Sequence, residues 1–163
     1  MSKSLHILTI KNPQEEKVLR SKSQDIKLED LEKKDFREFL ENLKETAESS
    51  EEQVGVQSAG ISAPQVGKNI RVFYILDSKG EEFKLFLNPK VDIINLKQDI
   101  EYEGCLSVPN VEEPVARYKK IRVTYIDKNG KKQKGIFKDM EAREIQHEAD
   151  HLEGILFIDR IEK

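Results

Sequence analysis

The stretch Gln146-His-Glu-Ala-Asp-His151 holds the most informative pattern of the sequence. Its two histidines, His147 and His151, are four residues apart, so on a helix they share one face, with Cβ atoms about 5–6 Å apart. Both imidazoles can then bind one cation, while Glu148 can approach a water at that cation without binding the metal. Because this pattern also occurs by chance on solvent-exposed helices, a metal site needs further support from the rest of the sequence.

A pair of histidines leaves such a site incomplete, since catalytic zinc-type sites usually take three protein ligands and a water. The third histidine of the metzincin pattern would fall at Phe157, and His6 near the N-terminus is more typical of an ordinary surface or strand residue. Cys105, the single cysteine, is a strong ligand for zinc or iron(II) once deprotonated. Taken alone, it is more typical of a small buried residue, and a thiol nucleophile is another alternative. Beside two histidines that lack a third partner, we favour Cys105 as a metal ligand.

The composition indicates a globular protein of one domain, predicted to span residues 1–163. Charged residues make up 36% and hydrophobic residues 37% of the chain, which excludes a disordered or membrane-embedded protein. The 28 Lys and Arg residues against 31 Asp and Glu residues leave a net charge of −3, which favours neither nucleic acid nor a membrane as partner. A single cysteine cannot form an intramolecular disulfide and fits a reducing compartment. We expect a cytoplasmic protein and a monomer.

Hydrophobic spacing predicts an α+β fold. Apolar residues mostly three or four apart predict an amphipathic helix from Leu28 to about Ser50. A second helix is predicted from Asp139, as its N-cap, through Leu152 to a stop near Gly154. Between the two helices, strand-like runs occur at Arg71–Leu76, Phe83–Leu87, Val91–Leu96, Ile121–Ile126 and, more weakly, Gly135–Phe137.

Three stretches together resemble the peptide deformylase family: Gly60-Ile-Ser-Ala-Pro-Gln-Val-Gly67, Glu103-Gly-Cys-Leu-Ser107 and Gln146-His-Glu-Ala-Asp-His151. They occur in the order and with the spacing typical of that family, and the resemblance extends from about Leu5 to Arg160. Each motif is modest alone, but the three together are hard to obtain by chance. The resemblance implies a metal-dependent hydrolase that removes the formyl group from the N-terminal formyl-methionine of nascent polypeptides and releases formate.

The resemblance also implies an architecture and a set of partners. The fold would be a single domain of mainly antiparallel, curled strands packed around a central C-terminal HExxH helix, with an N-terminal amphipathic helix. The substrates would be formyl-Met nascent peptides, and docking on the ribosome near the exit tunnel is a further expectation. Neither nucleic acid nor a membrane is an expected partner.

By the same resemblance, Cys105, His147 and His151 would hold one divalent metal ion. Iron(II) is the expected native metal, with nickel, cobalt or zinc as alternatives, because one cysteine and two histidines suit several of these ions. Glu148 would take a proton from the attacking water and deliver it to the leaving amine.

The remaining site residues implied by the resemblance bind the oxyanion and the peptide. The side-chain amide of Gln65 and the backbone N–H of Leu106 would stabilise the developing oxyanion. The backbone at Ala59, Gly60 and Gly104 would pair with the substrate peptide as an added strand, which tolerates varied sequences.

The chain departs from the family pattern at acidic residues. Glu144 lies three residues before His147, on the metal-facing side of the predicted helix, where relatives usually place a small or apolar residue. Glu112 and Glu113 lie where many relatives carry an arginine that holds the substrate backbone. We hypothesise that these carboxylates weaken methionine binding or alter the preference at the next residue, unless Arg143 or another base neutralises Glu144 or its carboxylate points to solvent.

Two alternatives remain beside this interpretation. One is a zincin-like metalloprotease that uses the same helix, disfavoured by its missing downstream ligand. The other is a deformylase-like metal-binding protein with an altered substrate or no turnover. The presence of Glu148 and Gln65 argues against the second, since neither is needed merely to hold a metal.

Overall fold

The strands of the protein form two antiparallel sheets. The computed structural model describes residues 2–161. The five-stranded sheet has the order β1 (Gly60–Ser62), β2 (Val72–Leu76), β3 (Phe83–Ile93), β6 (Lys120–Ile126) and β7 (Lys132–Lys138). The second sheet contains only β4 (Gln98–Cys105) and β5 (Val108–Tyr118).

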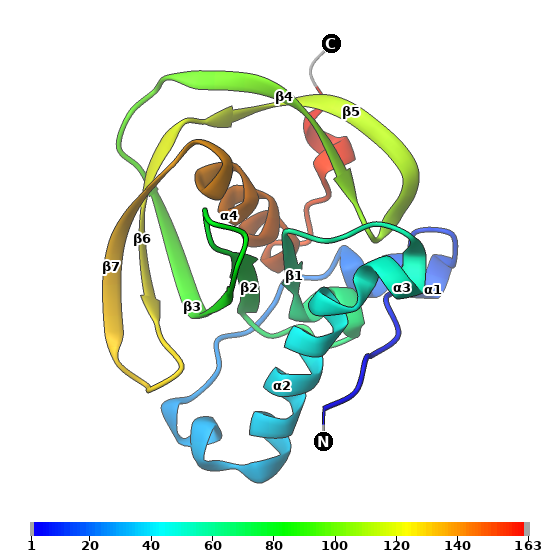
Figure 1. Ribbon diagram of the computed structural model, residues 1–163, viewed down its shortest axis with the longest axis vertical. Coiled ribbons are helices and arrows are strands. Elements are labelled where there is room, and N and C mark those ends of the chain that lie inside the picture. The colour runs from blue at the N-terminus through cyan, green and yellow to red at the C-terminus, as the bar shows by residue number, and fades with distance from the viewer. Residues whose placement is uncertain (1, 162–163) are drawn as a thin grey trace.

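Helices cover the five-stranded sheet from two directions. The α-helices of the described residues are α1 (Pro13–Leu19), α2 (Lys34–Glu48), α3 (Ser50–Val54) and α4 (Asp139–Leu152). In Figure 1, α4 lies in the middle of the molecule, with β4 and β5 arching over one side of it and β1, β2 and β3 on another. The predicted α+β fold, with curled antiparallel strands around the C-terminal HExxH helix and an amphipathic helix nearer the N-terminus, is therefore confirmed.

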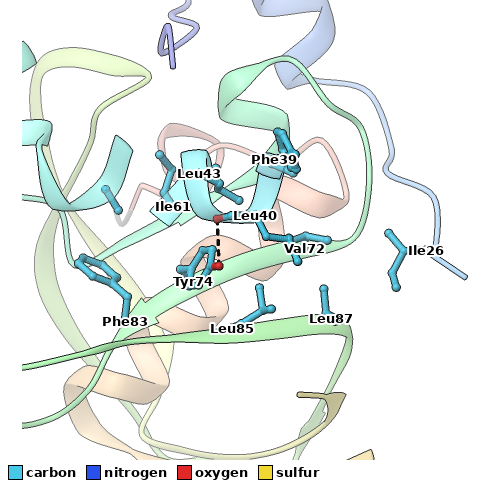
Figure 2. Packing of buried hydrophobic residues seen from close by; sticks show 12 residues of the cluster. Ile26, Phe39, Leu40, Leu43, Ile61, Val72, Tyr74, Phe83, Leu85 and Leu87 are labelled. Carbon is cyan, nitrogen blue, oxygen red and sulfur yellow. Dashed lines mark hydrogen bonds between the residues drawn. The ribbon is translucent and has the colours of Figure 1, made fainter. Parts of the chain in front are cut away.

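Alternation along β2 explains how one sheet can be covered on both faces, because successive side chains of a strand point to opposite sides. Val72 and Tyr74 pack with residues of α2, and Figure 2 shows the Tyr74 hydroxyl donating to the Leu40 carbonyl at 3.0 Å. Phe73 and Ile75 face the other way and pack with α4. The sheet thus holds α4, and with it the HExxH residues, against a fully buried surface.

The first predicted helix is shorter than expected. Its first part, Leu28–Glu32, is a 3₁₀-helix, and α2 begins only at Lys34. The Asp30 carboxylate accepts a hydrogen bond from the backbone N–H of Lys27 at 2.9 Å and pairs with Lys33 at 2.9 Å. Such local side-chain bonds compete with a continuous α-helix, and the chain takes an extended conformation at Lys33 before α2 begins.

The strand predictions were partly wrong. The runs predicted at Phe83–Leu87 and Val91–Leu96 belong to the single strand β3, whose pairing with β6 shifts register between Leu87 and Lys90. Strands β1, β4 and β5 were not predicted. Strand β1 is only three residues long, and the one buried residue of β4 is the charged Glu103. Strand β5 contains Pro109 and Pro114, and proline argues against a strand. The helix α1 was missed although Asn12 and Pro13 are a typical N-cap and first helical residue.

Among the described residues, no helix has the length and apolar character needed to cross a membrane.

Candidate active site

The two histidines of the HExxH pattern lie on the buried side of α4. Their side chains are almost fully buried, and the ring centroids of His147 and His151 are 5.3 Å apart. Ala142, Ile145 and Leu152 occupy another side of the helix and pack against the five-stranded sheet. Buried residues therefore lie on more than one side of α4, and the histidine side is enclosed as well.

Cys105 meets the histidines from the other sheet. It is the last residue of β4, and a tight turn at Leu106 and Ser107 leads from it into β5. Its Sγ lies 3.4 Å from Nε2 of His151, and the ligand atoms of Cys105, His147 and His151 all lie within 4.8 Å of one another. One sulfur and two imidazole nitrogens are a donor set that suits iron(II), zinc, cobalt or nickel, so the residues fit one divalent metal ion.

The protonation of His151 agrees with such a site. Burial lowers the pKa of His151 well below its ordinary value, so the ring is neutral, which is the form that binds metals. Burial acts the same way on His147, but hydrogen bonds with Cys105 and Glu103 outweigh it and raise the pKa of His147 well above the ordinary value. A cation would replace the proton on the ring nitrogen that faces Cys105.

A buried ion cluster orients His147. Its Nδ1 donates to Oε1 of Glu103 at 2.9 Å, which leaves Nε2 for the Cys105 side. Arg117 donates two hydrogen bonds to Glu103, each of 2.9 Å, and Arg143 donates a third of 2.6 Å. Burial alone would raise the pKa of Glu103, but Arg117 and His147 hold it well below its usual range, so the carboxylate is ionised. Glu103 thus positions His147 through a charge-assisted hydrogen bond.

Gln65 points its amide nitrogen at the same cluster. Its carbonyl oxygen accepts a hydrogen bond from the Ser62 backbone N–H at 3.0 Å, so the amide nitrogen must point the other way, toward Cys105 and Ser107. Nε2 lies 3.2 Å from Ser107 Oγ and 3.6 Å from Cys105 Sγ. The donor end of this fully buried amide is therefore beside the candidate metal site.

Glu148 is buried beside Gly60. Its Oε1 is buried without a hydrogen-bond partner among the residues described. Burial raises the pKa of Glu148 to about 8, with a smaller opposing effect from the nearby His147. A carboxyl whose pKa lies near neutrality can accept and release a proton at working pH, which is the property of a general acid–base residue.

These residues open into one cavity. A cavity of about 810 Å³ is lined by Gln65, Cys105, Leu106, His147 and Glu148, together with three further residues of the predicted site, Ala59, Gly60 and Gly104. The volume is in the range of ordinary ligand sites. Of the site residues expected from the sequence, only His151 is not part of the lining, although its ligand atom lies within 4.8 Å of those of Cys105 and His147.

Comparison with known proteins identifies the family. A family model described as polypeptide deformylase matches residues 4–163. The chain belongs to the polypeptide deformylase family. The peptide deformylase of Treponema pallidum is 42% identical over 109 residues, which cover 67% of this chain and 66% of that protein. The peptide deformylase of Synechocystis is 36% identical over 151 residues, 90% of this chain and 75% of the relative.

The fold of the deformylase family is also shown by solved structures. A class I type b peptide deformylase from Acinetobacter baumannii, solved with Met-Ala-Ser bound, superposes with a TM-score of 0.85. It is 26% identical, and the match covers 99% of this chain and all of that one. The aligned part of the Treponema relative spans slightly less than two thirds of its length. The family supports the deformylase interpretation and supports neither the zincin-like protease nor the metal-binding protein without turnover.

The acidic residues that depart from the deformylase pattern divide into two groups. Glu144 and Glu112 both line the cavity, whereas Glu113 does not. Arg143, which was expected as a neutralising partner for Glu144, instead pairs with Glu103 and Asp99.

The buried cluster around Glu103 was missed by the sequence analysis. Glu103, Arg117 and Arg143 are all nearly fully buried, although charged residues rarely are unless paired. One signal was available, since Glu103 stands two residues before Cys105 and would share its face of a strand. Without β4 in the prediction, that signal could not be used.

Proposed function

We propose that the protein removes the formyl group from N-terminal formyl-methionine peptides in a metal-dependent hydrolysis, with Cys105, His147 and His151 as the metal ligands. The observation that carries this proposal is the convergence, in one cavity, of that ligand cluster with the unpartnered carboxyl of Glu148 and the amide nitrogen of Gln65. Nascent polypeptides are the proposed substrates, and iron(II) is the proposed native metal, with nickel, cobalt and zinc as alternatives.

The reaction adds water across the formyl C–N bond, which yields formate and a free amine. Cys105, His147 and His151 would hold the divalent metal, which would supply Lewis-acid chemistry to the hydrolysis. Glu148 takes one proton from the attacking water and later delivers it to the amine nitrogen as the C–N bond breaks. Its pKa near neutrality suits both halves of this transfer.

Charge that develops on the formyl oxygen needs donors already in position. Gln65 Nε2 is held there by the bonds at the other end of its amide, and the Leu106 backbone N–H lies in the turn beside Cys105. The peptide would align along β1, which among the described residues is an edge strand paired with β2. At Gly60 it would displace the Ser58 hydroxyl, which hydrogen-bonds both the backbone N–H and the carbonyl of Gly60. Gly104 lines the facing part of the cavity.

The first test is anaerobic turnover of formyl-Met-Ala-Ser by protein loaded separately with iron(II), nickel or zinc, with metal content measured in parallel. Formate release, strongest with iron or nickel, is expected. Full metal occupancy without formate release from any loaded form would overturn the proposal.

Two variants separate the roles of the site residues. Cys105→Ala should lose stoichiometric metal, whereas Glu148→Gln should keep it and lose formate release by a factor of 10² or more, on the order expected for a general acid–base residue. Glu141→Gln, on the same helix but outside the cavity lining, is the matched control and should keep both metal and turnover. An active Glu148→Gln variant would contradict the assigned role. Ribosome docking and a monomeric state stay predictions.

A further inference from the structure

Two carboxylates other than Glu148 line the substrate cavity, and they come from different elements. Glu144 lies on α4, one turn before His147, so its Cβ is about 5–6 Å from that of His147. Glu112 lies on β5, and its Cγ is 3.5 Å from the point that a Cβ at Gly104 would occupy. Gly104 directly precedes Cys105. Both carboxylates are therefore neighbours of the ligand cluster.

No cationic side chain of the described residues pairs directly with these two carboxylates. Within residues 2–161, neither Glu144 nor Glu112 forms an ion pair or a side-chain hydrogen bond, and Arg143 is held by Glu103 and Asp99. Among the described residues, the lining of the cavity includes no Lys or Arg. Its one basic side chain outside the ligand cluster is His6, whose Nε2 pairs with Glu15 at 3.1 Å.

Glu112 is exposed at the cavity mouth, whereas Glu144 is half-buried. An unpartnered, partly buried carboxylate such as that of Glu144 is costly, because it loses water without gaining a cation or donor. Burial raises the pKa of Glu144, which is the expected response of such a group. The net charge of the chain is only −3 over 163 residues, so the surplus of negative charge in the cavity is local. A cation brought by the ligand would recover the lost interaction, and a ligand carboxylate would be repelled.

We propose that Glu144 and Glu112 are specificity-determining residues that favour formyl peptides with Lys or Arg directly after the first residue and disfavour Asp or Glu there. The inference rests on the proposed function, because the formyl group must lie at the ligand cluster for this register to hold. With the formyl carbon there, the first residue follows it, and the side chain of the next residue begins two steps along the extended peptide, roughly 7 Å from the formyl carbon. A lysine side chain from that point can reach either carboxylate across the cavity.

The test compares kcat/KM for formyl-Met-Lys-Ser, formyl-Met-Ala-Ser and formyl-Met-Glu-Ser at low and high salt. Wild-type protein should prefer Lys over Ala, and Ala over Glu, each by about fivefold, the size expected for a partly exposed ion pair. The preference should shrink at high salt, which screens the charges. In the Glu112→Gln, Glu144→Gln double variant the three peptides should converge, and each single variant shows how much of the preference its carboxylate supplies.

The matched control is Glu101→Gln, which removes the same charge from an exposed position of β4 outside the cavity lining. This variant should keep the wild-type order of peptides. If wild type and the double variant show the same preference, or if wild type shows none, the proposal is wrong.

A binding measurement makes the test independent of turnover. Calorimetric titration of the metal-loaded protein with the unformylated peptides Met-Lys-Ser and Met-Glu-Ser should give a Kd for the lysine peptide about 25-fold lower, which combines both steps of the kinetic preference. Equal affinities would overturn the inference while formate release still supported the proposed function. A clear Lys preference in binding without any formate release would instead support the acidic cavity and overturn the proposed function.

Discussion

Gly60 packs so closely against Glu148 that a Cβ at position 60 would lie 3.0 Å from Oε2 and 3.1 Å from Cγ of Glu148. Only a residue without a side chain lets the first strand of the sheet and the carboxyl of α4 approach to this distance. The edge strand β1, proposed to pair with the substrate, therefore also holds the proposed proton-transfer residue in place.

Gly60→Ala should displace Glu148 by a few tenths of an ångström or more and lower kcat for formyl-Met-Ala-Ser by roughly 10- to 100-fold, since small misplacements are costly in catalysis. Metal content should be unchanged, because the atoms that a Cβ at position 60 would meet belong to Glu148 and Ile75 and not to the proposed metal ligands. Gly135→Ala is a matched control, as its Cβ would meet Phe137 at 3.1 Å, equally close but on β7 and outside the cavity. An unchanged kcat in Gly60→Ala would show that the contact does not position Glu148.

Glu103→Gln should destabilise the fold by about 3–5 kcal/mol, because it removes the anion that pairs with two buried arginines. Urea unfolding measures this loss. Metal affinity should fall by roughly 10- to 100-fold, the usual effect of removing the group that orients a ligating histidine. Glu101→Gln, two residues earlier on β4 and exposed, should change neither quantity. Equal stability of the two variants would contradict a structural role for the cluster.

Gly154→Ala should be far more destabilising than Gly80→Ala. Both glycines have a positive φ, +75° and +71°, so both alanines pay about 1–2 kcal/mol for the left-handed conformation. A Cβ at position 154 would also collide with the Arg20 carbonyl oxygen and lie 2.6 Å from its carbon, whereas nothing lies within 4 Å at position 80. We expect an additional loss of about 2 kcal/mol from this overpacking. Thermal unfolding that gave equal losses would contradict the packing of α1 against the end of α4.

Tyr74→Phe should change how stability depends on alkaline pH. Burial raises the pKa of Tyr74 far above its ordinary value, and its hydroxyl donates to Leu40 of α2 (Figure 2). The folded state therefore binds this proton more tightly than the unfolded state, whose tyrosine titrates near pH 10. The associated stability is complete below about pH 10 and decreases as pH rises further, by up to about 1.4 kcal/mol per pH unit.

The difference between wild type and Tyr74→Phe in denaturant unfolding isolates this effect, since both proteins share all other titrating groups. At neutral pH the variant should be less stable by about 1 kcal/mol, the value of one hydrogen bond. Above pH 10 this difference should shrink and then reverse. A difference that stays constant with pH would show that Tyr74 does not titrate differently in the folded state.

Local patterns were sufficient for the extent of α4 and for the candidate ligands on it. Helical periodicity, which depends on neighbours within one or two turns, placed His147, Glu148 and His151. The helix ends at Leu152 as predicted, but Asp139, predicted as the N-cap, is its first helical residue, and Lys138 is the N-cap. Strand β2 was also predicted well because it is a short, continuously apolar run. Cys105 was predicted as a ligand by elimination and by family resemblance, and the fold brings it beside the histidines.

The tertiary structure decided what depends on residues far apart in the sequence. Glu103, Arg117, Arg143 and His147 come from β4, β5 and α4, and no local period predicts which buried charges will pair. The charge partners of Glu144 were likewise beyond the sequence, although its spacing placed it on the metal-facing side of α4. The sequence could not show whether Arg143 would pair with Glu144. In the structure Arg143 pairs with Glu103 and Asp99 instead, because β4, which carries both, packs beside the helix. The sequence alone therefore determined the candidate ligand set, because two of its three members are local on one helix, and the tertiary structure determined which charged groups surround it.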